Sequence, residues 1–263
     1  MPAPDFRLCL VTDRAGTRGR PLARVVQECL AAGLRAVQLR EKDLAPAELF
    51  QLAGELRALT WRHGARLFVN DRADVALAVG ADGLHLPADG LPPEAARRLI
   101  GFERFLGVST HSAAEAEAAG RGGADFVFFG PVYDTPSKRQ HGTPQGLAAL
   151  AAACQRSPVP VVAIGGVTAA RVAEVQRAGA AGVAVIRALL EHDDPARATK
   201  ELLAACEEAW RRGPPVSSTG AGGEGGRPSA GTRADAPRPS RPRGSAPPLP
   251  PGVGGAGGEG RPE

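Results

Sequence analysis

Two cationic side chains stand two positions apart where a short apolar segment ends. The stretch AVQLREK places Gln38, Arg40 and Lys42 on one face of an extended chain, and Val37 and Leu39 on the other. Arginine supplies a planar fork of donors and lysine a point charge, which together suit a pyrophosphate. A solvated strand end could carry the same charges, but the continuous polar face favours an anion clamp.

A carboxamide and a carboxylate, Asn70 and Asp71, end another apolar segment. Mg²⁺ in proteins is usually held by one or two carboxylates together with phosphate oxygens and waters. Asp71 is therefore a candidate metal ligand beside a polyphosphate site. An aspartate in this position could instead cap the helix predicted from Arg72. Taken alone, these residues leave the two interpretations even, and the neighbouring cations favour the metal.

Glycines near the end of the chain's apolar segments indicate a second anion site. Gly165 and Gly166 follow one segment, and Arg187 follows another that ends at Ile186. Glycines allow backbone N–H groups to approach an anion closely, although a tight turn would also use them. Between the two regions runs a long polar stretch, Phe128–Leu147, whose hydroxyls and cation are typical of a binding loop. His85 and His111 are not assigned as bases from the sequence.

Eight short apolar segments alternate with helical patterns and must position these groups. The expected strands are Arg7–Thr12, Ala36–Arg40, Arg66–Asn70, Gly83–Leu86, Phe105–Val108, Phe126–Phe129, Val159–Ile164 and Gly182–Ile186. This rhythm predicts a closed parallel (β/α)8 TIM barrel, an α/β fold with its chemistry at the carboxyl ends of the strands. An open doubly wound sheet is disfavoured because no GxGxxG follows the first strand. Ser112 and Thr168 are expected to cap helices.

Composition divides the 263 residues into two parts. Residues 1–212 can form one domain, whereas residues 213–263 are rich in glycine and proline, lack aromatic residues and are expected to be disordered. The net charge of +4 is too small for a nucleic-acid footprint. Four scattered cysteines without a CxxC pair, and the absence of a long apolar run, indicate a soluble cytoplasmic protein. Small-molecule substrates are the expected partners, and a homo-oligomer is left open.

Eight motifs occur together in one order over about residues 7–190: TDR, QLREK, VNDR, ADGLHL, GVSTHS, FFGPVYDTPSK, AIGGV and GVAVIRAL. In order and spacing they resemble the thiamine phosphate synthase family. The related thiazole tautomerases share the fold and many of the motifs. The synthase family joins hydroxymethylpyrimidine diphosphate to a thiazole phosphate, carboxylated or not, and releases pyrophosphate. The resemblance implies a Mg²⁺-assisted, dissociative transferase reaction.

The resemblance also implies roles for individual residues. Arg40, Lys42, Lys138 and Ser109 would be catalytic, and Asp71 would bind Mg²⁺. The positions matching the pyrimidine diphosphate site are Gln38, Arg40, Lys42, Asn70, Ser109 and Lys138. Those matching the thiazole phosphate site are Thr135, Ser137, Gly166, Ile186 and Arg187.

Three positions depart from what the resemblance implies or bear on its alternatives. Many synthases carry a second metal-binding aspartate where this chain has Gly90, and Asp89 stands one residue earlier. Asp89 is therefore the candidate for the second ligand. Arg187 occupies a place where the family often has serine. Some tautomerases carry an acid/base histidine where this chain has Pro131, which cannot transfer a proton. A tautomerase and a non-catalytic binding barrel remain the alternatives.

Overall fold

The structure is a computed structural model that describes residues 5–134 and 144–211. Three of the expected site residues, Thr135, Ser137 and Lys138, lie outside the described residues. The expected disordered tail, residues 213–263, also lies outside them. All four cysteines are free thiols, as their spacing indicated.

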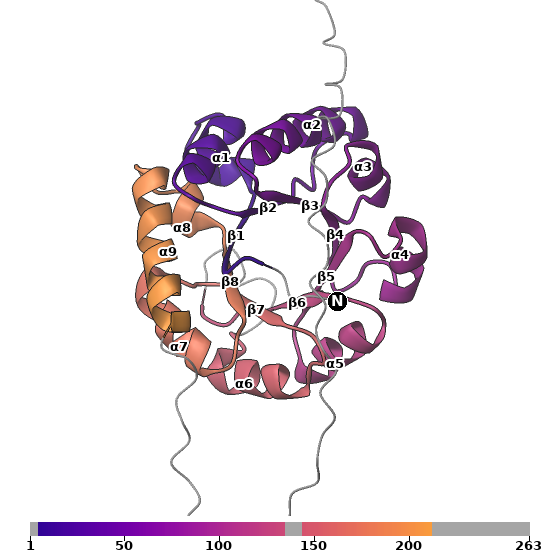
Figure 1. Ribbon diagram of the computed structural model, residues 1–263, viewed down its shortest axis with the longest axis vertical. Helices are drawn as coiled ribbons and strands as arrows, with labels where there is room; N and C mark the ends of the chain where they lie inside the picture. Colours follow the sequence, from indigo (N-terminus) through magenta and orange to yellow (C-terminus); the bar gives the residue numbers. More distant parts are fainter. Residues whose placement is uncertain (1–4, 135–143, 212–263) are drawn as a thin grey trace, which may run out of the picture.

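Eight parallel strands pair in sequence order and close into a barrel surrounded by a ring of helices (Figure 1). The strands are β1 (Leu8–Val11), β2 (Ala36–Leu39), β3 (Arg66–Asn70), β4 (Gly83–Leu86), β5 (Phe105–Thr110), β6 (Phe126–Phe129), β7 (Val161–Ile164) and β8 (Gly182–Val185). Pairing of Leu8 with Val183 and of Leu10 with Val185 closes the barrel between β1 and β8. The predicted TIM barrel is confirmed.

The helices follow the predicted rhythm with two additions. They are α1 (Leu22–Ala31), α2 (Pro46–Arg62), α3 (Ala73–Ala78), α4 (Pro93–Ile100), α5 (Ala113–Arg121), α6 (Gly146–Arg156), α7 (Val172–Arg177), α8 (Arg187–Leu190) and α9 (Pro195–Arg211). A 3-10 turn, η1 (Arg14–Thr17), and α8 were not expected, because four residues are too few to show a helical period. A second 3-10 turn, η3 (Ala169–Arg171), precedes α7 in what was expected to be one helix.

Both expected N-cap residues stand at the N-cap position, but only one of them makes a side-chain capping bond. Ser112 accepts a hydrogen bond from the Glu115 N–H at the start of α5, as predicted. Thr168 stands at the N-cap position of η3, but its side chain makes no capping hydrogen bond. The tight 3-10 geometry at that point replaces the regular first turn that a threonine cap would serve.

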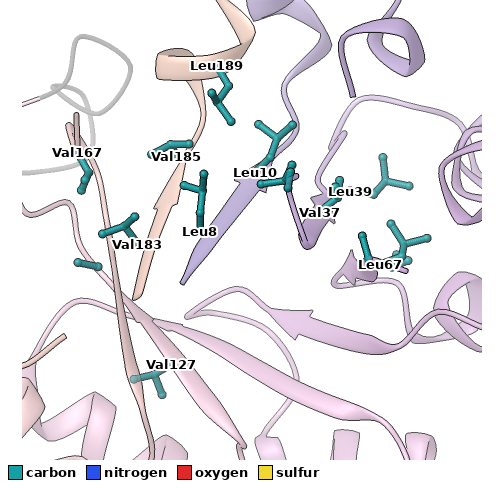
Figure 2. Close-up of a cluster of buried hydrophobic side chains, with 14 of the residues drawn as sticks. Leu8, Leu10, Val37, Leu39, Leu67, Val127, Val167, Val183, Val185 and Leu189 are labelled. Carbon is teal, nitrogen blue, oxygen red and sulfur yellow. The ribbon is translucent and has the colours of Figure 1, made fainter. Parts of the chain in front are cut away.

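Alternate residues of each strand face the helices and form the outer core. Leu8 and Leu10 of β1 and Val37 and Leu39 of β2 belong to this cluster (Figure 2). The same cluster contains Val183 and Val185 of β8, so it continues across the point of barrel closure. The alternation predicted for the QLREK stretch is therefore observed, with Val37 and Leu39 turned away from the barrel interior.

Aromatic rings fill the lower part of the barrel interior, towards the amino-terminal ends of the strands. Phe68 and Phe126 pack edge to face, with ring centroids 5.4 Å apart. Glycines make room for them, because a Cβ on Gly83 would lie 2.7 Å from the Phe68 ring and one on Gly107 would lie 2.6 Å from the Phe126 ring. The aromatic layer leaves the upper part of the interior to the polar residues of β2 to β5.

Two Asp–Arg pairs tie strands to helices at the lower, amino-terminal end of the barrel. Asp125, just before β6, accepts hydrogen bonds from the Leu106 N–H of β5 at 2.8 Å and from Arg97 of α4 at 2.7 Å. Asp82, just before β4, accepts in the same way from the Leu67 N–H and from Arg57 of α2. Each carboxylate thus bridges a strand edge and a helix at the end of the barrel away from the predicted site.

Removing residues 213–263 is expected to leave the midpoint of thermal unfolding unchanged. The barrel is closed by β1 and β8, and α9 packs against α1 and α7, all within the described residues. Circular dichroism melts of full-length and truncated protein test this, and a lower midpoint for the truncated chain would contradict it.

Among the described residues, no helix is both long and apolar enough to cross a membrane.

Candidate functional site

Four polar side chains form a layer above the aromatic rings, near the carboxyl ends of β2 to β5. The Gln38 Nε2 donates to Asn70 Oδ1 at 3.1 Å, and His85 Nε2 lies 3.0 Å from Ser109 Oγ. The Gln38 Oε1 and His85 Nδ1 atoms are buried and have no hydrogen-bond partner among the described residues. Buried polar atoms without partners are rare in folded proteins. The unpaired Gln38 oxygen is therefore a candidate acceptor for a ligand donor group.

His85 is held neutral in this layer. Burial, and secondarily the charge of Arg40, lowers the pKa of His85 to about 3. Its ring packs against Phe128 with centroids 4.3 Å apart. A neutral imidazole of such low basicity orients Ser109 and is a poor proton acceptor at neutral pH. The Ser109 hydroxyl lies against His85 and does not cap the following helix, because Ser112 caps α5.

The burial of neutral His85 predicts a pH dependence of stability. Its pKa is about 3 in the folded protein and near 6.5 when the chain unfolds. Below about pH 6.5 the unfolded state therefore binds more protons, and stability falls as the pH falls, by about 1.4 kcal/mol per pH unit from this group. The variant His85→Gln should remove that increment from the slope measured by urea unfolding between pH 6 and pH 4. Equal slopes for variant and wild type would show that His85 titrates normally in the fold.

The two predicted clamp residues lie at the rim above β2. Arg40 and Lys42 line a cavity of about 1030 Å³, and Lys42 also lines an adjoining cavity of about 330 Å³. Arg40 is partly exposed and Lys42 is exposed. Within residues 5–134 and 144–211, neither side chain forms an ion pair. Both cations are thus available to an anionic ligand at the rim.

Asp71 stands on the smaller cavity in a conformation that is unusual for its type. Its φ is +64°, a left-handed value that costs a non-glycine residue on the order of 1–3 kcal/mol. The helix cap considered for it is not present, because α3 begins after Arg72 and has no side-chain capping bond. The Asp71 N–H donates to the His85 carbonyl at 2.9 Å, which joins Asp71 to the polar layer. This geometry favours a ligand-binding role for the carboxylate.

The smaller cavity is also lined by Asp89, the candidate for the second metal ligand. Lys42, Asn70, Asp71, Asp89 and Gly90 all line it. A Cβ on Gly90 would lie 2.8 Å from Pro87 Cδ, so this loop has no room for a side chain at position 90. Glu41 lines the cavity as well but is bonded to Arg14, which leaves the carboxylates of Asp71 and Asp89, and such a pair suits Mg²⁺ when phosphate oxygens and waters complete its shell. In the described part of the chain, no group of three or more metal-binding side chains forms a cage by itself.

The second predicted anion region lies above β7 and β8. Gly165 and Gly166 have φ of +95° and +69°, and a Cβ on Gly165 would lie 2.6 Å from Pro131 Cα. Ile186 is partly buried against both the inner and the outer core. Arg187 was expected just past a strand ending at Ile186, but β8 ends at Val185 and Arg187 begins α8. Its guanidinium pairs with Glu191 one helical turn later, 3.1 Å away.

The described residues on either side of positions 135–143 are held together between the two anion regions. The Gln145 N–H donates to Pro131 O at 2.8 Å, and the Gly146 N–H to Val132 O at 3.0 Å. The Tyr133 N–H donates to Gly165 O at 3.0 Å. Both ends of the predicted binding segment therefore lie at the rim beside β7.

The buried acid between the two clamp residues has a role that the sequence motif did not indicate. Glu41 accepts hydrogen bonds from the Arg14 N–H at 3.1 and 3.2 Å, and its side chain is 3% exposed. A charged residue in an exposed motif ordinarily indicates a solvated side chain. The sequence feature that could have revealed this contact is the position of Glu41, which lies in register with the polar residues at the end of the first strand, Thr12 to Arg14.

Comparison with known proteins agrees with this geometry. Residues 8–189 match the family described as thiamine monophosphate synthase. A thiamine-phosphate synthase of Chloroflexus aurantiacus is 46% identical over 200 residues, covering 76% of this chain and 92% of the relative. One from Roseiflexus castenholzii is 42% identical over 214 residues, covering 81% and 92%.

A solved structure has the same fold. The thiamine phosphate pyrophosphorylase from Pyrococcus furiosus superposes with a TM-score of 0.71 at 37% identity, covering 78% of this chain and 96% of that one. The likeness extends over most of both chains.

Proposed function

The chain belongs to the thiamine monophosphate synthase family and is an enzyme of that kind, and we propose that it joins hydroxymethylpyrimidine diphosphate to a thiazole phosphate. The observation that carries this proposal is the smaller cavity. It brings Lys42 together with the carboxylates of Asp71 and Asp89 beside the polar layer, while the other two charged residues of its lining, Glu41 and Arg72, are bonded to Arg14 and Asp74. A diphosphate with an aminopyrimidine ring matches both parts of this arrangement.

The ring of the first substrate is expected to occupy the polar layer. Gln38 Oε1 is a buried acceptor without a described partner, so it suits the amino group of the pyrimidine. Asn70 holds the Gln38 amide in place through the 3.1 Å hydrogen bond. Ser109, oriented by His85, adds a hydroxyl from the opposite side of the barrel mouth.

Bond breaking is expected to depend on charge stabilisation at the rim. The bond from the methylene carbon to the diphosphate oxygen breaks, and the electron pair leaves with pyrophosphate. Arg40 and Lys42, with Lys138 from outside the described residues, would stabilise that developing charge. Asp71 and Asp89 would hold Mg²⁺, which when bound neutralises charge on the leaving group. No strong general base is needed, which agrees with the neutral, weakly basic His85.

The thiazole phosphate is expected to bind above β7 and β8. Backbone groups of Gly166 and Ile186 are proposed to bind its phosphate, with Thr135, Ser137 and Arg187 contributing side chains. The thiazole nitrogen then forms the new bond to the methylene carbon. The positive φ of Gly165 and Gly166 supports this placement, because such turns direct N–H groups towards an anion. Pro131 contributes no proton-transfer group, which argues against tautomerase chemistry at this position.

A direct assay tests the proposal. Purified protein is incubated with hydroxymethylpyrimidine diphosphate, thiazole phosphate and Mg²⁺, and thiamine phosphate and pyrophosphate are quantified by chromatography. Equal amounts of both products are expected. Conversion of a thiazole tautomer without formation of thiamine phosphate would replace the proposal with the tautomerase alternative, and binding without turnover would support the non-catalytic barrel.

The metal assignment predicts that Asp71→Asn and Asp89→Asn each weaken Mg²⁺ binding. Loss of one of two carboxylate ligands should raise the Mg²⁺ concentration for half-maximal activity by about tenfold or more. Calorimetric titration of Mg²⁺ in the presence of pyrophosphate gives a second readout that does not depend on turnover. Asp74→Asn is the matched control, because that carboxylate is exposed and paired with Arg72. An unchanged Mg²⁺ requirement in Asp89→Asn would leave Asp71 as the single protein ligand.

A further inference from the structure

Side-chain links continue the contact between the chain segments that follow β1 and β2. The last backbone bond between them runs from the Thr12 N–H to the Gln38 carbonyl at 2.9 Å. Beyond it, Thr12 Oγ1 accepts from the Arg40 N–H at 2.8 Å. The Arg14 N–H then donates to both oxygens of Glu41. These links extend the pairing of the strands past the end of β2 at Leu39.

A third link is made by the Arg14 guanidinium. Its two terminal nitrogens reach the two oxygens of Asp43 at 2.6 and 2.8 Å, and Nη1 also lies 3.3 Å from Glu41. A two-pronged arginine–carboxylate contact constrains orientation as well as distance. Arg14 therefore holds both Glu41 and Asp43, the residues on either side of Lys42.

The links are buried where they approach the clamp. Thr12 is fully buried, and the Glu41 side chain is 3% exposed. A buried carboxylate is stable only when hydrogen bonds or charges compensate it, and Arg14 provides both kinds of contact. Glu41 makes no contact that would be needed to close the barrel, because the strand register ends before it. The presence of a buried carboxylate at this place in the rim therefore needs another explanation.

We propose that Thr12, Arg14 and Glu41 are positioning residues that hold Arg40 and Lys42 at the spacing a diphosphate requires. Arg40 and Lys42 lie after β2, in chain without regular structure, where their backbone would otherwise be free to move. The Arg40 N–H bond to Thr12 fixes one cation, and the Arg14 links to Glu41 and Asp43 fix the other between them. This inference rests on the proposed function, in which those two cations bind the diphosphate.

A purely electrostatic role for Glu41 predicts the opposite sign of effect. Glu41 places a negative charge between two cations, so removal of that charge alone would strengthen the attraction for an anion. Loss of positioning would weaken anion binding despite the more positive field. The variant Glu41→Gln, which keeps the size of the side chain, separates the two roles.

The experiment measures pyrophosphate affinity by calorimetry and KM for each substrate in Glu41→Gln, Arg14→Met and Thr12→Val. We expect pyrophosphate binding to weaken and KM for the diphosphate to rise by about 10- to 100-fold in Glu41→Gln and Arg14→Met. KM for the thiazole phosphate should stay near the wild-type value. Thr12→Ser, which keeps the acceptor oxygen, should restore what Thr12→Val loses. Arg24→Met is the control, because that side chain is 75% exposed and pairs within α1.

Unchanged or tighter pyrophosphate binding in the Glu41 and Arg14 variants would overturn the inference, and so would an equal rise of both KM values. The Arg14 side chain is 38% exposed, and Arg14→Met keeps the backbone N–H that donates to both oxygens of Glu41, so this variant is expected to fold even if Glu41→Gln does not. Failure of the proposed function is distinguishable, since the wild-type protein itself would then form no thiamine phosphate.

Discussion

Replacing Arg40 by methionine is expected to lower kcat/KM for the diphosphate substrate by about 10²- to 10³-fold, with most of the loss in kcat. Removal of one preorganised donor from the place where charge develops typically has that effect. Arg40 has no ion-pair partner among the described residues and lines the cavity that the segments after β1 and β2 form with α1 and α2. Steady-state kinetics with the thiazole phosphate held at saturation measures both parameters.

Two variants control for the loss of a positive charge as such. Arg40→Lys should recover part of the activity, because a point charge remains but the planar fork is lost. Arg24→Met removes an exposed arginine on α1 and should retain wild-type kinetics. A rise in KM with kcat unchanged would mean that Arg40 binds the substrate and transition state equally, contrary to its proposed role in pyrophosphate departure.

Replacing Arg97 by methionine is expected to reduce the free energy of unfolding by about 3–5 kcal/mol, the usual cost of leaving one charge of a buried pair uncompensated. The Arg97 and Asp125 side chains are 7% and 4% exposed. Arg97 also donates to the carbonyls of Gly101, Arg104 and Gly123. Its loss therefore leaves the buried Asp125 carboxylate and three part-buried carbonyls without this donor, and urea unfolding followed by circular dichroism measures the cost.

The related pair at the same end of the barrel gives an internal comparison. Arg57→Met should cost less, because Asp82 is 17% exposed and Arg66 lies 4.0 Å from it. Turnover by folded Arg97→Met protein at low temperature should remain near wild type, since Asp125 precedes β6 at the end opposite the rim. A loss of stability below about 1 kcal/mol would show that the pair behaves like an exposed ion pair.

Much of the barrel could be predicted because its signals are local. Each strand is a short apolar run, and most helices have a period, several of them also a start signal, that nearby residues supply. The sequence-based predictions were wrong or undecided where a local signal was short or ambiguous. The four residues of α8 carry no readable period, and Asp71 fits both a helix cap and a ligand until its left-handed backbone is known.

The grouping of polar side chains near the strand ends could be predicted from residue type and strand position. Placing polar residues at the carboxyl ends of parallel strands brings Gln38, Asn70 and Ser109 to one layer, whatever the details of packing. The proximity of Asp89 to Asp71 could not be obtained in this way, because it depends on the turn that Pro87 and Gly90 make after β4.

The sequence by itself therefore determined the order of elements, the barrel and the face on which the polar side chains lie, since these follow from periodicities of two and 3.6 residues along the chain. Only the tertiary structure decided which charges meet. Glu41 reaches Arg14 and Asp125 reaches Arg97 across 27 and 28 positions of sequence, respectively. It also decided that His85 is neutral, because desolvation depends on every neighbour that the folded chain brings around the ring.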